Sequence, residues 1–248
     1  MGRNSIFDWL RRRRRVLEDS LIARGQAHTL SLTRYRLHRA IAATIAEHAK
    51  GDCLDAGSGR SPYKRLLLQH TEQVTSIDIE DRSGETDLIA DIQSMPQLND
   101  ASFDTILCSQ VLEHVPRPWD ALRELARVLR PGGVLILTVP HLSAIHEAPH
   151  DYYRYTRFGL QALCDQCSLT VMHVQATGGL GCFLLHGLSA ALLSALGGLP
   201  LIKWMAFSFN YLVLVRLPDF FEQYLGMPQL YPSEYLLVAT RPGDGERK

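Results

Sequence analysis

The chain has 248 residues, enough for one large α/β domain, and its 46% hydrophobic and 21% charged residues are ordinary for a globular protein. Its 26 basic and 26 acidic residues give a formal net charge of zero, so no overall field favours nucleic acid as a partner. The five cysteines are an odd number scattered through apolar segments, which indicates buried thiols rather than a disulfide framework. No apolar stretch typical of a secretory signal follows the arginines at 11–15, and a cytoplasmic location is therefore expected.

Residues 1–32 are expected to form an extension ahead of the main domain. Apolar residues recur at helical spacing around the arginine run, so the stretch 3–22 predicts a basic amphipathic helix. Such a helix either lies on an anionic membrane surface or presents a solvated face. A nucleic-acid role is disfavoured because no aromatic platform accompanies the basic run.

The main domain is expected at 33–241, with a short tail at 242–248. After a helix at 33–49, residues 53–60 (CLDAGSGR) predict a strand that ends on an acid and runs into a Gly-x-Gly turn. A further helix is expected at about 62–69. Strand, glycine turn and helix together are typical of a cradle for a nucleotide cofactor, because glycine permits positive φ and a close approach of the backbone to a ligand.

Further strands follow in alternation with helices. Residues 74–78 predict a strand that ends in Asp78, about twenty residues past the turn, where a doubly wound fold places a ribose-binding carboxylate. A short apolar segment ends in Asp91. The remaining strands are expected at 103–109, 133–140, 169–175 and 234–240, with a helix at 118–129. This alternation predicts an α/β protein with a doubly wound, mostly parallel sheet.

The acid ahead of the glycine turn distinguishes between two nucleotide cofactors. A nicotinamide-binding turn normally has three glycines in the pattern G-x-G-x-x-G and needs no preceding acid. Here Asp55 comes first, and the third glycine is missing. A carboxylate in this place suits a ligand with a cationic amine, such as the amino-acid end of S-adenosylmethionine.

The ordered motifs resemble those of class I S-adenosylmethionine-dependent methyltransferases, most closely the subgroup that includes ubiquinone and menaquinone methyltransferases. The similarity runs from about residue 50 to 165, through LDAGSG, SID, AD, FDTI, VLEHV and LRPGG in that order. It implies a seven-stranded Rossmann-like sheet and in-line attack of an acceptor on the sulfonium methyl group. In that chemistry the protein mainly aligns the acceptor and removes its proton.

The resemblance also implies which residues hold S-adenosyl-L-methionine. By position they are Asp55, Gly57, Gly59, Asp78, Ile79, Asp91, Ile92, Ser109 and Gln110. The first carboxylate and the two glycines would hold the methionine moiety, and Asp78 would hold the ribose. Ile79 would pack on the adenine, while Asp91 would bond its amino group, with Ile92 beside it. Ser109 and Gln110 would line the methionine side.

A histidine-rich segment at 141–155 follows the fifth strand, where the catalytic face of such a sheet opens. Its stretch HEAPH matches the H-E-x-x-H pattern of zinc proteases, but Pro149 excludes the continuous helix that this pattern requires. We interpret the segment as an acceptor-site loop with His150 as the candidate base, because histidine titrates near working pH. The candidate catalytic residues are His150, Asp151, Tyr152, Arg154 and His114.

Two alternatives for this segment stay open. A divalent metal could be held by His146, Glu147, His150 and Asp151, although the preferred interpretation has no metal. The segment could also be a polar lid that caps the next helix. His114 could likewise face the site or only cap the helix that follows it.

An apolar insert at 178–232 separates the last two strands. Residues 180–202 carry no charge and are long enough to span a membrane, but the final strand must return to the same sheet, and the second apolar piece, 204–215, is too short to cross. A helical hairpin is expected instead. Because soluble monomers rarely expose such a surface, the insert should meet lipid, a lipophilic substrate or another subunit.

The sequence thus predicts a cytoplasmic methyltransferase, with peripheral contact to the inner face of the membrane through 3–22 and 178–216. Its acceptor would be small or lipid-linked, with a hydroxyl favoured over a carbon. The alternatives are a non-catalytic S-adenosylmethionine-binding or assembly protein and, third, an NAD-dependent oxidoreductase. A homodimer is left open.

Overall fold

The computed structural model describes residues 17–22, 24–82, 84–197, 199, 202–225 and 231–243. The chain divides into two compact units, each built from segments that are distant in sequence. The α/β unit comprises Ala40–Ala176 and Glu234–Lys248, and the helical unit comprises Met1–Arg39 and Thr177–Ser233. The arginines at 11–15 and most of the predicted helix at 3–22 lie outside the described residues.

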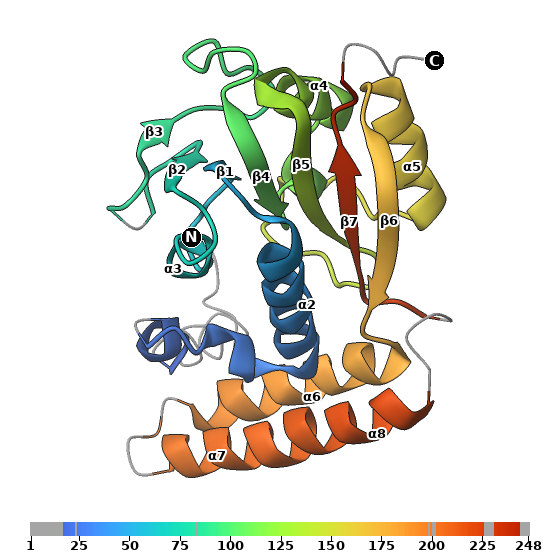
Figure 1. The fold of residues 1–248 in the computed structure, drawn as a ribbon. Helices are drawn as coiled ribbons and strands as arrows, with labels where there is room; N and C mark the ends of the chain where they lie inside the picture. The colour runs from blue at the N-terminus through green and yellow to red at the C-terminus, as the bar shows by residue number, and fades with distance from the viewer. Residues whose placement is uncertain are drawn as a thin grey trace. The chain divides into compact units, whose positions relative to one another are not determined.

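The α/β unit contains one seven-stranded sheet (Figure 1). Its strands are β1 (Asp52–Ala56), β2 (Gln73–Asp78), β3 (Leu88–Ile89), β4 (Phe103–Ser109), β5 (Leu129–Pro140), β6 (Thr170–Thr177) and β7 (Glu234–Thr240), in the order β3-β2-β1-β4-β5-β7-β6. The first five pair in parallel, whereas β7 runs antiparallel to β5. The predicted doubly wound, mostly parallel sheet is confirmed. Because the strand order reverses between β1 and β4, the carboxyl ends of these strands are where a ligand site is expected.

Helices connect the strands of this unit, namely the end of α2 (Leu32–His48), α3 (Lys64–Leu67), η2 (Leu112–His114), α4 (Pro118–Val128) and α5 (Arg157–Gln166). Pro118 occupies the first turn of α4, where its missing N–H is not needed. Thr156 caps α5 by accepting a hydrogen bond from the Gly159 N–H at 3.0 Å.

Two boundaries differ from the sequence-based expectation. The predicted helix at 62–69 shortens to α3, which begins two residues after Pro62. The helix expected at 118–129 ends at Val128, because Leu129 is already extended at φ −73° and ψ 133°, and β5 begins there rather than at residue 133.

The core of the α/β unit lies between the sheet and α4. The strands β4 and β5 are buried on both faces along most of their length, as expected of central parallel strands. Against them α4 packs the apolar face that its helical spacing predicts, which consists of Ala121, Leu122, Leu125 and Val128.

The helical unit contains the expected apolar hairpin. Helix α6 (Leu180–Leu196) lies beside a rod formed by α7 (Lys203–Phe209), the π-helical η3 (Asn210–Arg216) and α8 (Leu217–Leu225) (Figure 1). The unit also holds η1 (Ala27–Leu30) and the start of α2. Its small core consists of Leu17, Leu21, Leu30 and Leu193. Every helix within the described residues falls short of what a bilayer crossing requires in length and apolar content.

Candidate functional site

The turn after β1 is fixed to the neighbouring strand by backbone hydrogen bonds. The N–H groups of Gly57 and Ser58 both donate to the carbonyl of Ile77, at 2.9 Å each. Gly57 has φ +74°, and a Cβ atom there would come within 2.4 Å of Val111 Cγ2. Glycine is therefore required at this position both for its backbone conformation and for space.

Two carboxylates meet at this turn, as the ends of adjacent parallel strands predict. Asp78 Oδ2 accepts a hydrogen bond from the Gly59 N–H at 2.8 Å. Asp55 is 3% exposed, and burial together with the nearby charge of Asp78 raises its pKa to about 7. Asp55 Oδ2 and Ser58 Oγ are buried and have no hydrogen-bond partner among the described residues. These atoms are free to bind a ligand that donates hydrogen bonds, and an ammonium group would suit Asp55.

The residues predicted near an adenine ring differ in their exposure. Ile79 directly follows β2 and is 66% exposed, so its side chain is available to a ligand. Asp91 is exposed and accepts a hydrogen bond from the Gln93 N–H at 2.9 Å. Ile92 packs into the core of the α/β unit.

Ser109 and Gln110 lie at the carboxyl end of β4. The hydroxyl groups of Ser109 and Thr138 are 2.9 Å apart, and Gln110 adopts φ +58° while its N–H donates to the Thr138 carbonyl. The Gln110 side chain also reaches Glu234 on β7. Burial raises the pKa of Glu234 to about 7, and the hydrogen bond from Gln110 opposes this shift.

Asp151 and Arg154 hold the histidine-rich segment in shape. Their ion pair is bidentate, with Arg154 Nη1 2.6 Å from Asp151 Oδ1 and Nη2 2.8 Å from Oδ2. The Arg154 hydrogen bonds hold the pKa of Asp151 well below its usual range. Arg154 also donates to the carbonyls of Ser143 and Ala144, and Asp151 accepts from the His146 N–H. This pair positions the loop.

The two histidines predicted to be catalytic have different surroundings. The ring of His150 is exposed, and its Nδ1 lies 3.2 Å from the hydroxyl of Tyr152, which is also exposed. His114 lies on the inner side of the segment, where its Nδ1 is 2.6 Å from the His150 carbonyl oxygen. The His114 side chain is 18% exposed.

The preferred interpretation of the sequence included neither Glu113 nor His146, and His146 appeared only in the metal alternative. Glu113 is fully buried in η2, and burial raises the pKa of its carboxyl to about 8. His114 Nε2 and His146 Nε2 lie 3.7 and 3.9 Å from Glu113 Oε1. The only signal in the sequence was the acid–histidine pair after β4, since the loop that brings His146 alongside is set by tertiary structure.

Known proteins that are similar to this chain include methyltransferases, in agreement with the motifs around the glycine turn. Residues 54–137 match the family model described as a methyltransferase domain. The chain is 33% identical over 128 residues to 27-O-demethylrifamycin SV methyltransferase of Amycolatopsis mediterranei (strain S699), covering 45% of this chain and 47% of that protein. It is 34% identical over 108 residues to ubiquinone biosynthesis O-methyltransferase of Xanthomonas euvesicatoria pv. vesicatoria (strain 85-10), covering 38% of this chain and 45% of that protein. The chain thus spans about half the length of these curated relatives.

A solved structure extends the similarity over most of the fold. It is the Burkholderia thailandensis 1,6-didemethyltoxoflavin-N1-methyltransferase with bound 1,6-didemethyltoxoflavin and S-adenosylhomocysteine, with a TM-score of 0.54, 17% sequence identity and coverage of 83% of this chain and 78% of that one. At this identity the likeness concerns the fold.

The sheet order, the glycine turn and the family match together define the class. Residues 54–137 carry a methyltransferase domain, and the motifs and sheet order of the chain are similar to those of class I S-adenosylmethionine-dependent methyltransferases. The cofactor of this class is S-adenosyl-L-methionine. The residues present fit it, because Asp55 Oδ2 and Ser58 Oγ are buried and have no partner in the described part of the chain. They lie beside a glycine turn in which a Cβ at Gly59 would meet no described atom within 4 Å.

Proposed function

We propose that this protein transfers the methyl group of S-adenosyl-L-methionine to a hydroxyl oxygen of a small or lipophilic acceptor. The observation that carries the proposal is the buried, unpartnered carboxylate oxygen of Asp55, next to a turn tied to Asp78. When bound, the cofactor supplies an electrophilic methyl group on a sulfonium centre. Oxygen is the favoured acceptor atom because the names of both curated relatives specify O-methylation or a methyl group on oxygen.

In this proposal each acid binds a different part of the cofactor. Asp55 accepts hydrogen bonds from the amino group of the methionine moiety, together with the turn at Gly57 and Gly59. Asp78 accepts from the ribose hydroxyls while it retains the Gly59 N–H. Around the adenine, Ile79, Asp91 and Ile92 would contact the base, and Ser109 and Gln110 would line the methionine side.

The acceptor would bind on the side of the histidine-rich segment. A hydroxyl acceptor must lose its proton on methylation, and His150 is the candidate base, with Tyr152 within hydrogen-bond distance of its ring. His114 supports this region from the inner side, where it donates to the His150 carbonyl. Asp151 and Arg154 act as positioning residues, since they form an ion pair with each other and Arg154 also donates to the loop backbone.

Titration calorimetry of the full chain tests the cofactor. We expect S-adenosylmethionine to bind and NAD to give no heat, which separates this protein from an oxidoreductase. Asp78→Ala should weaken cofactor binding, whereas unchanged affinity would remove Asp78 from the ribose role. Absence of binding at high protein concentration would overturn the proposal itself.

A second variant separates an enzyme from a protein that only binds the cofactor. An acceptor screen followed by mass spectrometry should give a product 14 Da heavier, the mass that one methyl group adds. His150→Ala should leave cofactor affinity intact and lower the turnover by roughly 10²-fold or more, the range for general bases. Unchanged turnover would assign the exposed His150 ring to a lid.

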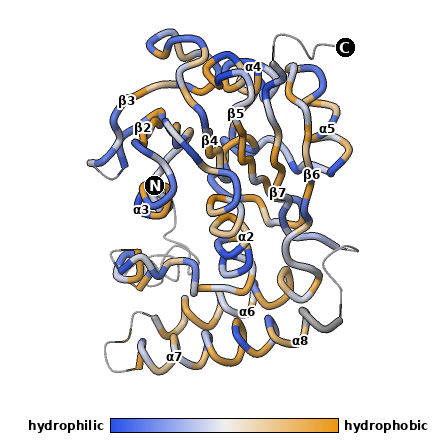
Figure 2. The backbone as a smooth tube through the Cα atoms, in the orientation of Figure 1, coloured by the Kyte–Doolittle hydropathy of each residue, from blue (hydrophilic) through white to orange (hydrophobic). Residues whose placement is uncertain are grey.

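We also propose that the helical unit contacts a lipid surface. Apolar residues on its helices remain more than half exposed, namely Leu184, Leu188, Met205, Phe209, Leu212, Leu217, Phe220 and Phe221. The hydropathy colouring shows how apolar α6 and the α7–α8 rod are (Figure 2). The segments of this unit also carry more basic than acidic residues, twelve against five, which favours an anionic membrane surface over a neutral one.

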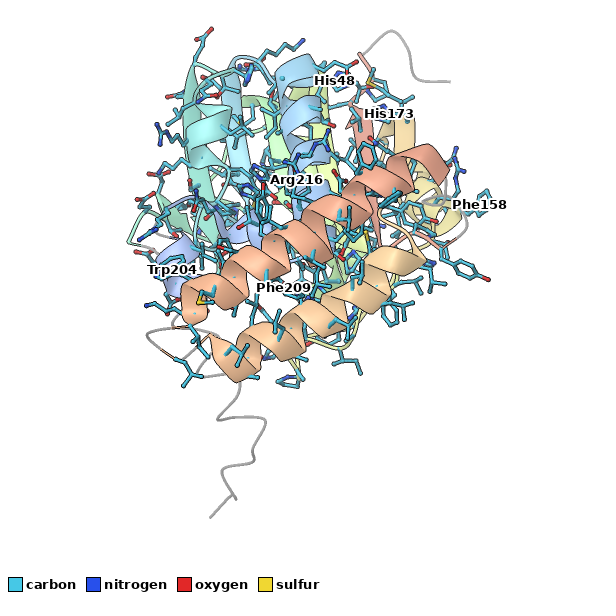
Figure 3. The ribbon with its side chains drawn as sticks, turned by 90° about the horizontal axis from the view of Figure 1, so that it is seen from below. His48, Phe158, His173, Trp204, Phe209 and Arg216 are labelled. Atoms are coloured by element: carbon cyan, nitrogen blue, oxygen red, sulfur yellow. The ribbon has the colours of Figure 1, made fainter. Side chains whose placement is uncertain are left out.

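Flotation with vesicles that contain anionic lipid tests this contact. Changing Leu184 and Phe209 to aspartate should abolish flotation, because both are exposed apolar residues of the hairpin. Phe158→Asp is the matched control, since Phe158 is 75% exposed but lies on α5 of the other unit (Figure 3). If none of the proteins floats and sedimentation shows a dimer that the double variant dissociates, the surface joins two copies of the chain instead.

A further inference from the structure

Glu113 presents a buried carboxylate that lacks the hydrogen bonds such a group normally needs. It lies in the middle of η2, is 0% exposed, and neither of its carboxylate oxygens has a hydrogen-bond partner in the part of the chain that the structure describes. Buried carboxylates are ordinarily paired, hydrogen-bonded or bound to a cation. The side chains that face it therefore indicate what compensates this group.

His114 faces Glu113 with a defined tautomer. Its Nδ1 is 2.6 Å from the carbonyl oxygen of His150, and a carbonyl can only accept, so Nδ1 carries the proton. In the neutral ring the lone pair is then at Nε2, which lies 3.7 Å from Glu113 Oε1. A histidine whose Nδ1–H is bonded to a backbone carbonyl is the usual form of a metal-ligating histidine.

His146 approaches Glu113 from the histidine-rich segment in the same way. Two oxygen acceptors lie near its Nδ1, the Ala144 carbonyl at 3.2 Å and Asp151 Oδ2 at 3.6 Å, and they favour a proton on that nitrogen. Its Nε2 lies 3.9 Å from Glu113 Oε1. Arg154 Nη2 is also 3.4 Å from the His146 Nδ1, and because a guanidinium only donates, this longer contact opposes that tautomer, whereas the nearer Ala144 carbonyl favours it.

Three potential ligand atoms thus converge without a hydrogen bond among them. One ligand atom from each of Glu113, His114 and His146 lies within 4.8 Å of the others, yet the nitrogen–oxygen distances of 3.7 and 3.9 Å are too long for a shared proton. We propose that these residues bind a divalent transition-metal ion. Two imidazole nitrogens and one carboxylate oxygen suit Zn²⁺ or a similar ion better than Mg²⁺ or Ca²⁺, which prefer oxygen ligands.

This set differs from the metal alternative drawn from the sequence. Glu147 is exposed and lies 3.8 Å from Arg82, and the His150 ring turns to Tyr152. Asp151 forms an ion pair with Arg154, and its Oδ2 lies 3.6 Å from the His146 Nδ1. A carboxylate in this place orients a metal-ligating histidine rather than binding the metal itself.

Three protein ligands leave a coordination position open, as in catalytic rather than structural zinc sites. The ion would bind the acceptor's hydroxyl oxygen there and lower its pKa, which eases loss of the proton before methyl transfer. This second step rests on the proposed methyltransferase function, whereas the binding of the metal does not.

Metal binding is measured on the full chain without cofactor, by calorimetry with Zn²⁺ and by the visible absorption of Co²⁺. We expect one equivalent of either ion. Glu113→Gln, His114→Ala and His146→Ala should each weaken binding by at least about 10–100-fold, the effect of removing supporting groups at known sites. His48→Ala is the matched control, because His48 and His173 form another histidine pair of the α/β unit, with ring centroids 6.1 Å apart (Figure 3).

Cofactor affinity of each variant shows whether it still folds. Full cofactor affinity with lost metal binding supports the site. Equal metal affinity in the wild type and the three ligand variants would overturn it, as would no binding at all in a wild type that binds cofactor, and Glu113 would then be a buried neutral acid. If the metal binds but a chelator leaves the turnover unchanged, the metal site stands and its role in activating the acceptor is overturned.

Discussion

At the scale of a single residue, the buried carboxylate of Asp55 lowers the stability of the folded state when it is ionised. Its carboxyl is buried near Asp78, and its pKa is raised from the ordinary 3.8 to about 7, first by burial and then by that neighbouring charge. A carboxyl with a raised pKa in the folded state contributes stability that is fully present below pH 3.8 and is lost as the pH rises through about 7. At pH 8 the ionised group therefore destabilises the fold by an amount on the order of 4 kcal/mol relative to acid conditions.

We expect the gain in stability of Asp55→Asn over the wild type to be larger at pH 8 than at pH 5, because the amide carries no charge to bury. Urea unfolding at the two pH values, without cofactor, measures the difference. The same variant should bind S-adenosylmethionine poorly. Asp91→Asn is the control, since it makes the same change at an exposed aspartate of the α/β unit. A gain for Asp55→Asn that is equal at both pH values would contradict the assignment of the buried charge.

At the scale of the element, the turn after β1 depends on two glycines for different reasons. Both have positive φ, +74° at Gly57 and +57° at Gly59. Only at Gly57 would a Cβ collide with a neighbour, the side chain of Val111. The turn is thus constrained on the side of the core and open on the other side, as a loop that receives a ligand must be.

Gly57→Ala should therefore destabilise the protein more than Gly59→Ala. Both substitutions cost about 1–2 kcal/mol for the left-handed backbone, and Gly57→Ala adds about 1–3 kcal/mol for overpacking. Adding Val111→Ala should recover part of the loss in Gly57→Ala and none in Gly59→Ala. Thermal unfolding of the four variants provides the comparison. Equal losses in both single variants would mean that backbone strain alone decides the turn.

The sequence predicts the elements of the sheet better than it predicts the acceptor side of the site. Strands β4 and β7 follow the expected residues because their apolar runs are bounded by clear turns, and Asp55 meets Asp78 because parallel strands share a carboxyl edge. Glu113 and His146 are brought together by an irregular loop that Arg154 holds, and no periodicity encodes such a contact.

At the scale of the whole molecule, each unit is closed by contacts between segments far apart in the chain. In the helical unit Asp219 accepts from Arg36 Nε at 2.9 Å and from Arg39 Nη1 at 3.1 Å, although about 180 residues separate them. The side chains of Asp219 and Arg36 are 8% and 11% exposed, whereas that of Arg39 is 54% exposed. The buried pair thus joins the start of α2 to α8.

Asp219→Ala should therefore loosen the helical unit and leave the α/β unit intact. Removing one partner of a buried ion pair leaves the other charge unpaired, which typically costs about 3–5 kcal/mol. Arg39→Ala, which removes the exposed partner, should cost about 1 kcal/mol or less. Hydrogen exchange should show lost protection in α8, η3 and the start of α2 for Asp219→Ala, with β4 and β5 still protected and S-adenosylmethionine still bound. Loss of protection in those strands as well would contradict this prediction and show that the two units unfold together.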